Sequence, residues 1–392
     1  MDVRTDPDRE TTAVGATAAA GPGGMIRRLR SALLLAWPAL VGYTAVRAVG
    51  LVTLAVWADA RDARFGRLIG IRADAGWYLR IAERGYDSGE RLQSDMAFFP
   101  LYPYVVSWLE PLSPLAMRNT AIAVAWVASL AAAWGLFAVG NHLHGRRTGV
   151  LLAVVWGLLP HAMVQSMAYT ESLFTALAAW SLYAVLTRRW LTAGVLCLLA
   201  GLTRPTASAL IPVVMLAALI ALVRRYGGWR AAVALVLAPL GWVGYLSWVG
   251  WRTGRPDGWF HIQSAGWGST FDAGAASVEA LGKALDEPSS LQWYMVATVA
   301  LVSVALFVLS CLDRQPWPLL MFSGLLLLTT LGSSGYFYSK ARFLLPAFAL
   351  LLPVARWLAG TTGPRMAVVL VTMTVISAYF GSYLLLIWTA SP

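Results

Sequence analysis

Charged residues are scarce in this sequence. Only 12% of its 392 residues are charged, whereas 58% are hydrophobic and the mean hydropathy is +0.64. A soluble domain carries about 25% charged residues. The shortage of charge excludes an ordinary soluble globular protein and, with the long apolar runs, predicts an all-α polytopic membrane protein.

Lysine and cysteine are also scarce. Lys283 and Lys340 are the two lysines, so arginine supplies the other 28 of the 30 basic residues and most of the formal charge of +11. In a membrane protein this excess marks cytoplasmic loops near anionic lipid, so we expect no nucleic-acid partner. Cys197 and Cys311 lie in apolar stretches without CxxC spacing, which argues against a zinc site or a disulfide framework.

Apolar runs predict about eleven membrane spans after a disordered cytoplasmic tail at residues 1–30. The membrane domain then covers residues 31–392. The fifth and sixth spans are interrupted by Arg204-Pro205 and Pro212, so the two could share one broken or re-entrant helix. The predicted spans lie near 32–57, 119–140, 149–167, 170–187, 191–207, 208–223, 231–251, 291–312, 317–331, 343–358 and 366–388.

The arginines predict the orientation of these spans. With the amino terminus in the cytoplasm, basic residues of the short loops all fall on the cytoplasmic side, as the positive-inside rule requires. They are Arg146-Arg147, Arg188-Arg189, Arg224-Arg225 with Arg230, Arg314, and Arg356 with Arg365. This arrangement predicts a multi-pass cell-membrane protein with three larger external segments at 58–118, 252–290 and 332–342.

Acidic residues are concentrated in the first external segment. Asp59, Asp62, Asp74, Glu83, Asp87, Glu90 and Asp95 lie there, and among the predicted spans only Glu171 is placed, at a helix end. An ion-coupled transporter would hold ionisable groups near the middle of the membrane. The pattern therefore favours chemistry at the external surface, and no internal repeat relates two halves of the chain.

Within the first external segment, residues 72–86 predict a short amphipathic helix that lies in the membrane interface and ends at Gly85. Asp74 would stand at its start, where it is either an N-cap or a general base between lipid headgroup and aqueous acceptor. Residues 97–103 contain clustered aromatics and prolines and predict re-entry into the interface before a second short helix near 104–109. The alternative for this cluster is an aromatic belt with turn prolines.

Five motifs follow one another along the chain. They are Asp74-Ala75-Gly76-Trp77-Tyr78 with Gly85-Tyr86, Phe98-Phe99-Pro100-Leu101-Tyr102-Pro103, Tyr169-Thr170-Glu171-Ser172-Leu173-Phe174, Leu202-Thr203-Arg204-Pro205, and Arg342-Phe343-Leu344-Leu345-Pro346. Together they resemble the bacterial branch of the PIG-V family of mannosyltransferases, within the GT-C superfamily of glycosyltransferases. The resemblance spans about residues 30–358. It implies a GT-C-type transmembrane helix bundle with a long first external loop that carries interfacial helices.

The resemblance implies an inverting enzyme that takes a sugar from a polyprenyl-phosphate donor at the external face. The family's catalytic acid carries over to Asp74, and mannose is expected from the resemblance alone. The leaving phosphate needs cationic stabilisation, for which Arg342, Lys340 and Arg204 are candidates, although Arg342 could instead be a snorkelling anchor. No obligatory metal is expected, but Asp95 could join Asp74 and restore a divalent-metal site. The acceptor, whether glycan, lipid or protein, stays open.

Candidates for sugar or acceptor contacts come from several segments of the chain. Glu171 is either a structural ion-pair partner of Arg204 or a sugar-binding acid, and Thr170 before it is a natural N-cap. The external run 259–268 mixes aromatics with His and Gln, a pattern typical of sugar sites, although it could also be a loop dipping into the interface. His161 could face the same cleft. The predicted sugar or acceptor contacts are Glu171, His261, Gln263, Trp267, Tyr78 and Tyr102.

Two other function classes stay open on the sequence. One is a transporter or flippase of lipid-linked sugar or polysaccharide. The other is a non-catalytic relative that binds lipid-linked sugar. A sugar-transfer assay separates both from the enzyme.

Overall fold

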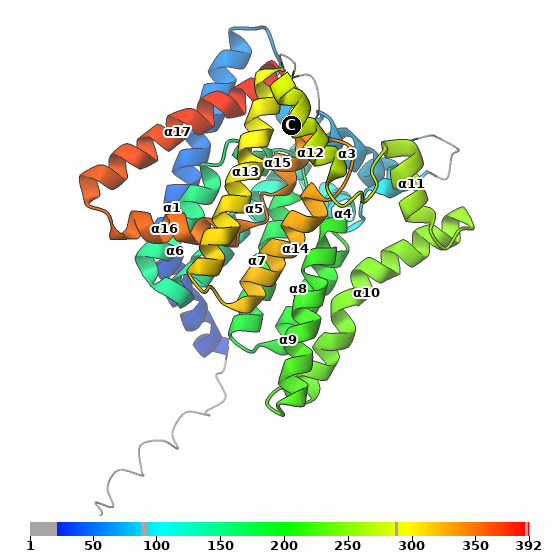
Figure 1. The fold of residues 1–392 in the computed structure, drawn as a ribbon, viewed down its shortest axis with the longest axis vertical. Coiled ribbons are helices and arrows are strands. Elements are labelled where there is room, and N and C mark those ends of the chain that lie inside the picture. The colour runs from blue at the N-terminus through cyan, green and yellow to red at the C-terminus, as the bar shows by residue number, and fades with distance from the viewer. Residues whose placement is uncertain (1–21, 88–92, 287–288, 389–390, 392) are drawn as a thin grey trace, which may run out of the picture.

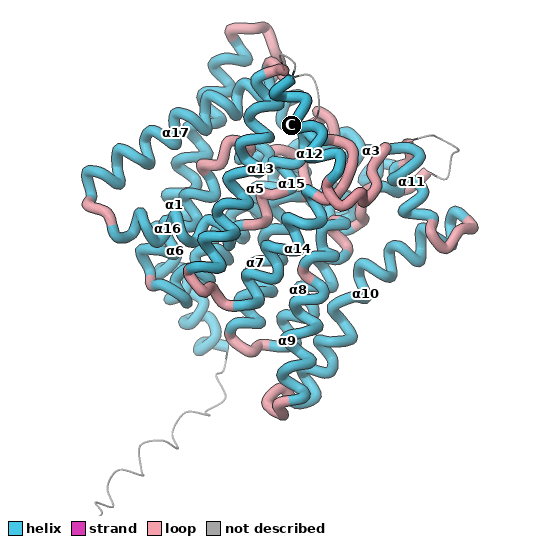
Figure 2. Tube along the Cα trace, viewed as in Figure 1, coloured by secondary structure: helices cyan, strands magenta, loops and turns pink. Residues whose placement is uncertain are grey.

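The structure is a computed structural model that describes residues 22–87, 93–286, 289–388 and 391. Within these ranges the chain is a bundle of helices joined by short loops, without any β-strand (Figure 2). A single antiparallel bridge joins Phe271 and Ser333. The prediction of an all-α protein is confirmed for the described residues.

The helices of the described ranges follow one another with few long connections (Figure 1). In chain order they are α1 (Pro22–Asp59), α2 (Phe65–Gly70), α3 (Asp74–Arg84), α4 (Leu101–Leu109), α5 (Met117–His144), α6 (Arg146–Gly157), α7 (Glu171–Leu186), α8 (Trp190–Gly201), α9 (Ile211–Val223), α10 (Gly228–Thr253), α11 (Gly258–Trp267), α12 (Ala275–Asp286), α13 (Leu291–Leu312), α14 (Trp317–Leu331), α15 (Lys340–Phe343), α16 (Leu352–Gly360) and α17 (Gly363–Leu386).

Six helical segments of the described chain are long and apolar enough to cross a bilayer, as expected for a multi-pass membrane protein. A seventh span results if Phe337–Phe343 and Phe348–Gly360, which are bent by 74°, count as one. The six segments are Arg30–Asp59, Met117–His144, Pro205–Val223, Gly228–Thr253, Leu291–Leu312 and Gly363–Leu386. The number of spans predicted from the sequence, about eleven, includes α7, α8 and α14, which are apolar but shorter.

Irregular backbone shortens several of the predicted spans. The predicted span 149–167 is helical only to Gly157 and continues as a buried 3₁₀ turn, Ala162–Ser166. The interruption predicted at Arg204-Pro205 is confirmed, because α8 ends at Gly201 and the turn Pro205–Ala209 precedes α9. Proline fits the first turn of a helix, where its missing N–H leaves no bond unmade.

The amino-terminal helix begins earlier than predicted. Residues 22–30, assigned to the disordered tail 1–30 from the sequence, belong to α1. Residues 1–21 of that predicted tail lie outside the described residues.

Small residues let the helices pack closely. In α8, a Cβ added at Gly194 would lie 2.8 Å from the backbone of Ala234 in α10. A Cβ added at Gly140 of α5 would lie equally close to Gly149 of α6. Close backbone approach through small residues is the usual way for apolar helices to associate in a membrane.

The two short helices predicted in the first long loop are present as α3 and α4. Helix α3 ends at Gly85, whose φ of 72° favours glycine. Tyr78, Ile81 and Ala82 are buried as the amphipathic pattern predicts, while Trp77 is half-buried. Helices α3, α11 and α12 gather at one end of the bundle, and the turn between α9 and α10, which carries Arg224-Arg225, lies at the other (Figure 1).

Candidate functional site

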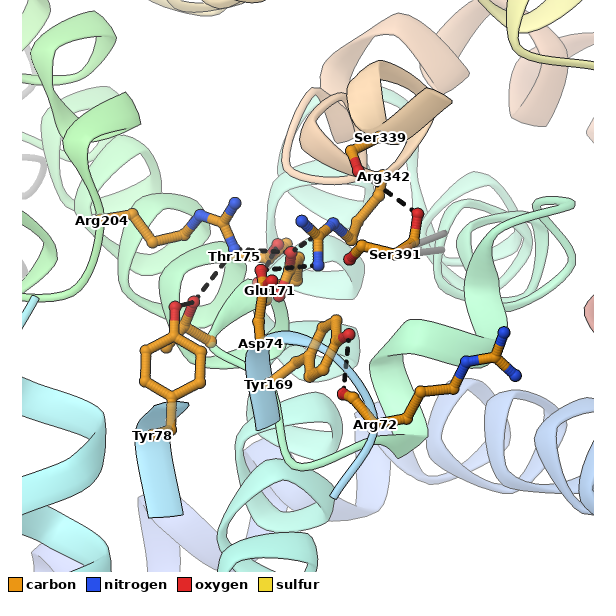
Figure 3. Close-up of polar contacts among 11 residues, drawn as sticks. Arg72, Asp74, Tyr78, Tyr169, Glu171, Thr175, Arg204, Ser339, Arg342 and Ser391 are labelled. Atoms are coloured by element: carbon orange, nitrogen blue, oxygen red, sulfur yellow. Dashed lines mark hydrogen bonds and ion pairs between the residues drawn. The ribbon is translucent and has the colours of Figure 1, made fainter. Parts of the chain in front are cut away.

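Four charged side chains from four separate segments converge at the end of the bundle near α3. Arg342 Nη1 lies 2.8 Å from Asp74 Oδ2, and Arg342 Nε lies 3.4 Å from Glu171 Oε1. Arg204 Nη1 lies 2.6 Å from the same Glu171 oxygen. We call Asp74, Glu171, Arg204 and Arg342 the ion cluster (Figure 3). The partnership predicted for Glu171 and Arg204 is confirmed.

The ion cluster is buried except at one point. The exposed fraction of the side chain is 1% for Glu171, 3% for Arg342 and 8% for Arg204, but 23% for Asp74. Two carboxylates balance two guanidinium groups, which offsets the large desolvation penalty of burying each charge. A reactant from outside therefore meets the ion cluster at Asp74 first.

Asp74 is the first residue of α3, and its carboxylate forms an ion pair with Arg342. The residue at the cap position is Ala73, which makes no side-chain cap and has a φ of 50°. A positive φ is rare for alanine and marks a strained backbone. The N-cap interpretation of Asp74 is thus not supported, since the carboxylate contacts Arg342 instead.

Arg72 and Tyr169 hold the strained turn in place, and neither was predicted as a site residue. Arg72 donates to the carbonyl oxygens of Leu385, in the last turn of α17, and of Trp388, just after that helix, and in Figure 3 its guanidinium points away from the ion cluster. Tyr169 donates through its hydroxyl to the Arg72 carbonyl oxygen at 3.2 Å. Burial lowers the pKa of Arg72. Tyr169 is the first residue of the motif that contains Glu171, but its hydrogen bond to Arg72 forms only in the folded protein.

Thr170 serves the ion cluster rather than capping α7. Its hydroxyl makes no cap bond but lies 3.0 Å from Arg204 Nη1 and 3.1 Å from the Tyr78 hydroxyl. Thr170 thus stands at the N-cap position of α7, as predicted, but its side chain makes no cap bond. A polar contact with Arg204 takes precedence because an unsatisfied buried guanidinium is more costly than an uncapped helix end.

The guanidinium groups retain capacity for another anion. Arg342 lies over the rings of Tyr169 and Phe343, at 5.1 and 4.9 Å from their centroids, which holds the plane of its guanidinium. Among the described residues, Nε and Nη1 of Arg342 have no aligned hydrogen bond, and neither has Nε of Arg204. The attraction of these nitrogens to the carboxylates is therefore ionic. Oxygen atoms of a bound ligand can still accept hydrogen bonds from their N–H groups.

Tyr78 and Tyr102, predicted as sugar contacts, pack inside the protein. The Tyr78 ring meets Phe98 and Tyr102 edge-on, and burial raises its pKa. Tyr102 is fully buried and donates to the carbonyl oxygen of Ala121 at 2.7 Å. Tyr78 touches the ion cluster through Thr170, whereas Tyr102 supports the packing behind it.

Most of the predicted run 259–268 forms helix α11 rather than an irregular loop, and only its last aromatic reaches α3. The Trp267 ring lies 5.3 Å from the rings of Trp77 and Phe98. His261 is exposed, and Gln263 donates to the carbonyl oxygen of Ala97 at 3.4 Å. Trp77 stands three residues after Asp74 on α3, so Trp267 packs against the helix that carries Asp74.

Lys340 lies outside the ion cluster, although it is close to Arg342 in the sequence. Its Nζ donates to Ser277 Oγ at 2.5 Å and to the Ser333 carbonyl oxygen at 2.6 Å. These bonds join the start of α12 to the end of α14. Lys340 therefore holds α12 against the end of α14, and none of its hydrogen bonds among the described residues involves Arg342 or Arg204.

His161 faces a cavity of its own. It is buried, and neither ring nitrogen has a hydrogen-bond partner among the described residues. The cavity, of about 40 Å³, is lined by apolar residues of α13 and of the segment after α15, including Val299, Leu344 and Leu350. His161 is therefore no member of the ion cluster.

No group of three metal-ligating side chains occurs in the described part of the chain. Asp95, the residue that could restore a metal site, accepts a bond from the Asp87 backbone N–H at 2.9 Å. Burial raises the pKa of Asp95. Within the described part of this loop its hydrogen-bond partner is the Asp87 backbone, and no contact among the described residues joins it to Asp74.

Comparisons with known proteins do not identify the chain. No family model matches the sequence, and no curated protein matches it.

Proposed function

We propose that this protein is an inverting glycosyltransferase that moves a sugar from a polyprenyl-phosphate donor to an acceptor hydroxyl at the external membrane face. The observation that carries the proposal is the buried ion cluster with Asp74 as its single partly exposed carboxylate. The motif resemblance supplies the reaction type and mannose as the sugar. The arginine pattern of the loops supports the external face.

The charges of the ion cluster suit the two ends of such a reaction. Arg342 and Arg204 are permanently charged and can bind a phosphate bidentately. When the donor phosphate binds Arg342, it competes with Asp74 for the same guanidinium. The carboxylate of Asp74 is then released from its ion pair and becomes a stronger base.

The reaction follows as a single displacement. The acceptor oxygen attacks the anomeric carbon and gives its proton to the Asp74 carboxylate. The bond between the anomeric carbon and the phosphate oxygen breaks, and polyprenyl phosphate leaves with the electron pair. Arg342 and Arg204 stabilise the charge that develops on that phosphate. The configuration at the anomeric carbon inverts.

A sugar-transfer assay tests this proposal. Purified protein is given polyprenyl-phosphate mannose and a mixture of membrane acceptors, and transferred mannose is measured. Asp74→Asn keeps the shape of the side chain but removes its basicity, so we expect the rate to fall by about 100-fold or more. Transfer at the wild-type rate by this variant would exclude Asp74 as the base.

The buried charges also suit a transporter of lipid-linked sugar, because ionisable side chains inside membrane bundles often mark transport pathways. Movement of intact donor across vesicles by the purified protein, with no transferred sugar, would favour this second function. The position of the exposed carboxylate at one end of the bundle favours the enzyme.

A further inference from the structure

A buried arginine in the first span lies outside the ion cluster. Arg47 belongs to α1, about 18 Å along the helix from its end at Asp59. Its exposed fraction is 1%, and every hydrogen-bond acceptor around it in the described chain is neutral. An arginine at such depth is costly and usually has a function.

The acceptors of Arg47 are Gly157, the last residue of α6, and residues of the irregular segment that joins α6 to α7. Its Nε and Nη2 donate to Ser166 Oγ at 3.3 and 3.1 Å, and its Nη1 donates to the Gly157 carbonyl oxygen at 3.4 Å. Nη2 also lies 3.4 Å from Met163 Sδ. One planar guanidinium thus ties the start and the end of the segment to the same point of α1.

The segment needs this support because it is buried and, apart from the 3₁₀ turn Ala162–Ser166, lacks regular helical hydrogen bonds. Residues 161–170 are all buried, and backbone N–H and C=O groups away from water must find partners. The segment leads directly into Glu171, the first residue of α7. Its path therefore decides where the central carboxylate of the ion cluster lies.

A second residue on the same face of α1 extends the support. Tyr43, four residues before Arg47, donates to Gln165 Oε1 at 2.9 Å, and Gln165 Nε2 donates to the Trp156 carbonyl oxygen. The Gln165 carbonyl oxygen accepts from Ser172 Oγ at 3.1 Å, directly beside Glu171. Residues four apart share a helix face, so α1 presents Tyr43 and Arg47 together.

The same network reaches the other side of the ion cluster. Trp156 stacks on Tyr43, with ring centroids 5.4 Å apart, and its Nε1 donates to the Leu345 carbonyl oxygen at 2.9 Å. The Leu345 N–H in turn donates to the Arg342 carbonyl oxygen at 3.0 Å. One face of α1 thus connects to both Glu171 and Arg342 through hydrogen bonds of ordinary length.

We propose that Arg47 is a positioning residue, which fixes residues 157–166 against α1 and thereby sets the distance between Glu171 and Arg342. It touches no reacting atom. The effect on sugar transfer rests on the function proposed above, whereas the effect on the segment does not.

The experiment uses the full-length protein in lipid nanodiscs, with two readouts. Arg47→Met removes all donors but keeps a long side chain, and we expect kcat to fall by about 100-fold while KM for the donor changes by less than about twofold. Arg47→Lys, which retains one donor group that can reach Ser166, restores part of kcat. Arg365→Met, at an exposed position of α17, is the matched control and keeps wild-type kcat.

The second readout is amide hydrogen exchange followed by mass spectrometry. In Arg47→Met we expect exchange within 158–170 to accelerate by about tenfold, with α8 and α10 unchanged. Equal acceleration in every helix would mean general destabilisation and would overturn the proposal, as would unchanged exchange in 158–170. If Arg47→Met does not fold, Ser166→Ala removes the acceptor of two of the bonds and is read in the same way.

A failure of the proposed function is recognised separately. If the wild-type protein transfers no sugar, the glycosyltransferase assignment fails, and hydrogen exchange still decides whether Arg47 fixes the segment. If the wild-type protein is active and Arg47→Met keeps full kcat, the positioning role is refuted while the enzyme assignment stands.

Discussion

Replacement of Glu171 by glutamine tests the ion cluster most directly. The substitution keeps the size of the side chain and removes the negative charge that lies 2.6 Å from Arg204 and 3.4 Å from Arg342. Two buried guanidinium groups are then left with Asp74 as the single carboxylate of the ion cluster. Glu171→Gln should therefore destabilise the protein more than Asp74→Asn does.

The burial of each carboxylate sets the expected magnitude. Removing one partner of a buried ion pair costs about 3–5 kcal/mol, and we expect about 3 kcal/mol for Glu171→Gln because Asp74 still faces Arg342. Asp74 is 23% exposed and pairs with one guanidinium, so Asp74→Asn should cost about 1 kcal/mol. For a protein of this size these values correspond to Tm losses of about 6 °C and about 2 °C.

Thermal unfolding of the purified variants, followed by tryptophan fluorescence at one scan rate, measures these losses. Glu279→Gln is the matched control, because Glu279 forms an exposed pair with Lys283 in α12 and its Tm should change by less than about 1 °C. Asp74→Asn should lose most of its sugar-transfer activity with only a small loss of Tm, whereas Glu171→Gln should lose both activity and Tm. An equal or larger Tm loss for Asp74→Asn would refute the assignment of Glu171 as the central buried carboxylate.

Three further predictions concern positions outside the ion cluster. Lys340→Met should lower stability by about 1–3 kcal/mol, because it leaves the Ser333 carbonyl without its donor, yet KM for the donor should stay within about twofold; a large rise in KM would restore Lys340 to the phosphate site. The raised pKa of Asp95 means that the folded state holds its proton more tightly than the unfolded state, so its contribution to stability is present at low pH and is lost as pH rises above the usual Asp range. Asp95→Asn should therefore gain Tm relative to wild type from pH 4 to pH 7, and a difference that does not change with pH contradicts this. Gly149→Ala would place a Cβ 2.6 Å from the Phe137 carbonyl oxygen and should cost about 1–3 kcal/mol, while Gly244→Ala in α10, which meets no atom within 4 Å, should be neutral or stabilising; equal Tm values for the two would contradict the tight α5–α6 contact.

Local signals in the sequence predict much of the fold. The apolar runs predicted the long helices, and the period of apolar residues in 72–86 predicted the short helix α3 with its end at Gly85. Proline at position 205 correctly marked the break after α8. These features depend on residues within one or two helical turns, so the sequence contains all that is needed to predict them.

The errors concern residues whose partners are far away in the chain. Thr170 is an ideal cap by local rules, but its hydroxyl is used by Arg204 and Tyr78. Lys340 is two residues from Arg342, yet their side chains lie in different surroundings because the short helix α15 directs them apart. Arg47 lies within the first predicted span, and a charged residue far from either end of a span is a sequence signal that predicts a functional role.

By itself the sequence determined that this protein is helical, with apolar helices long enough to cross a membrane, and it singled out Asp74, Glu171, Arg204 and Arg342 as candidate site residues, because composition and motif are local properties. Only the tertiary structure decided that these four side chains form one cluster and that Asp74 is its exposed member. The physical reason is that buried charges must find opposite charges. Which charges meet is set by the packing of distant segments, since Arg204 and Glu171 are 33 residues apart in the chain and Arg342 and Asp74 are 268 apart, and no local pattern encodes that packing.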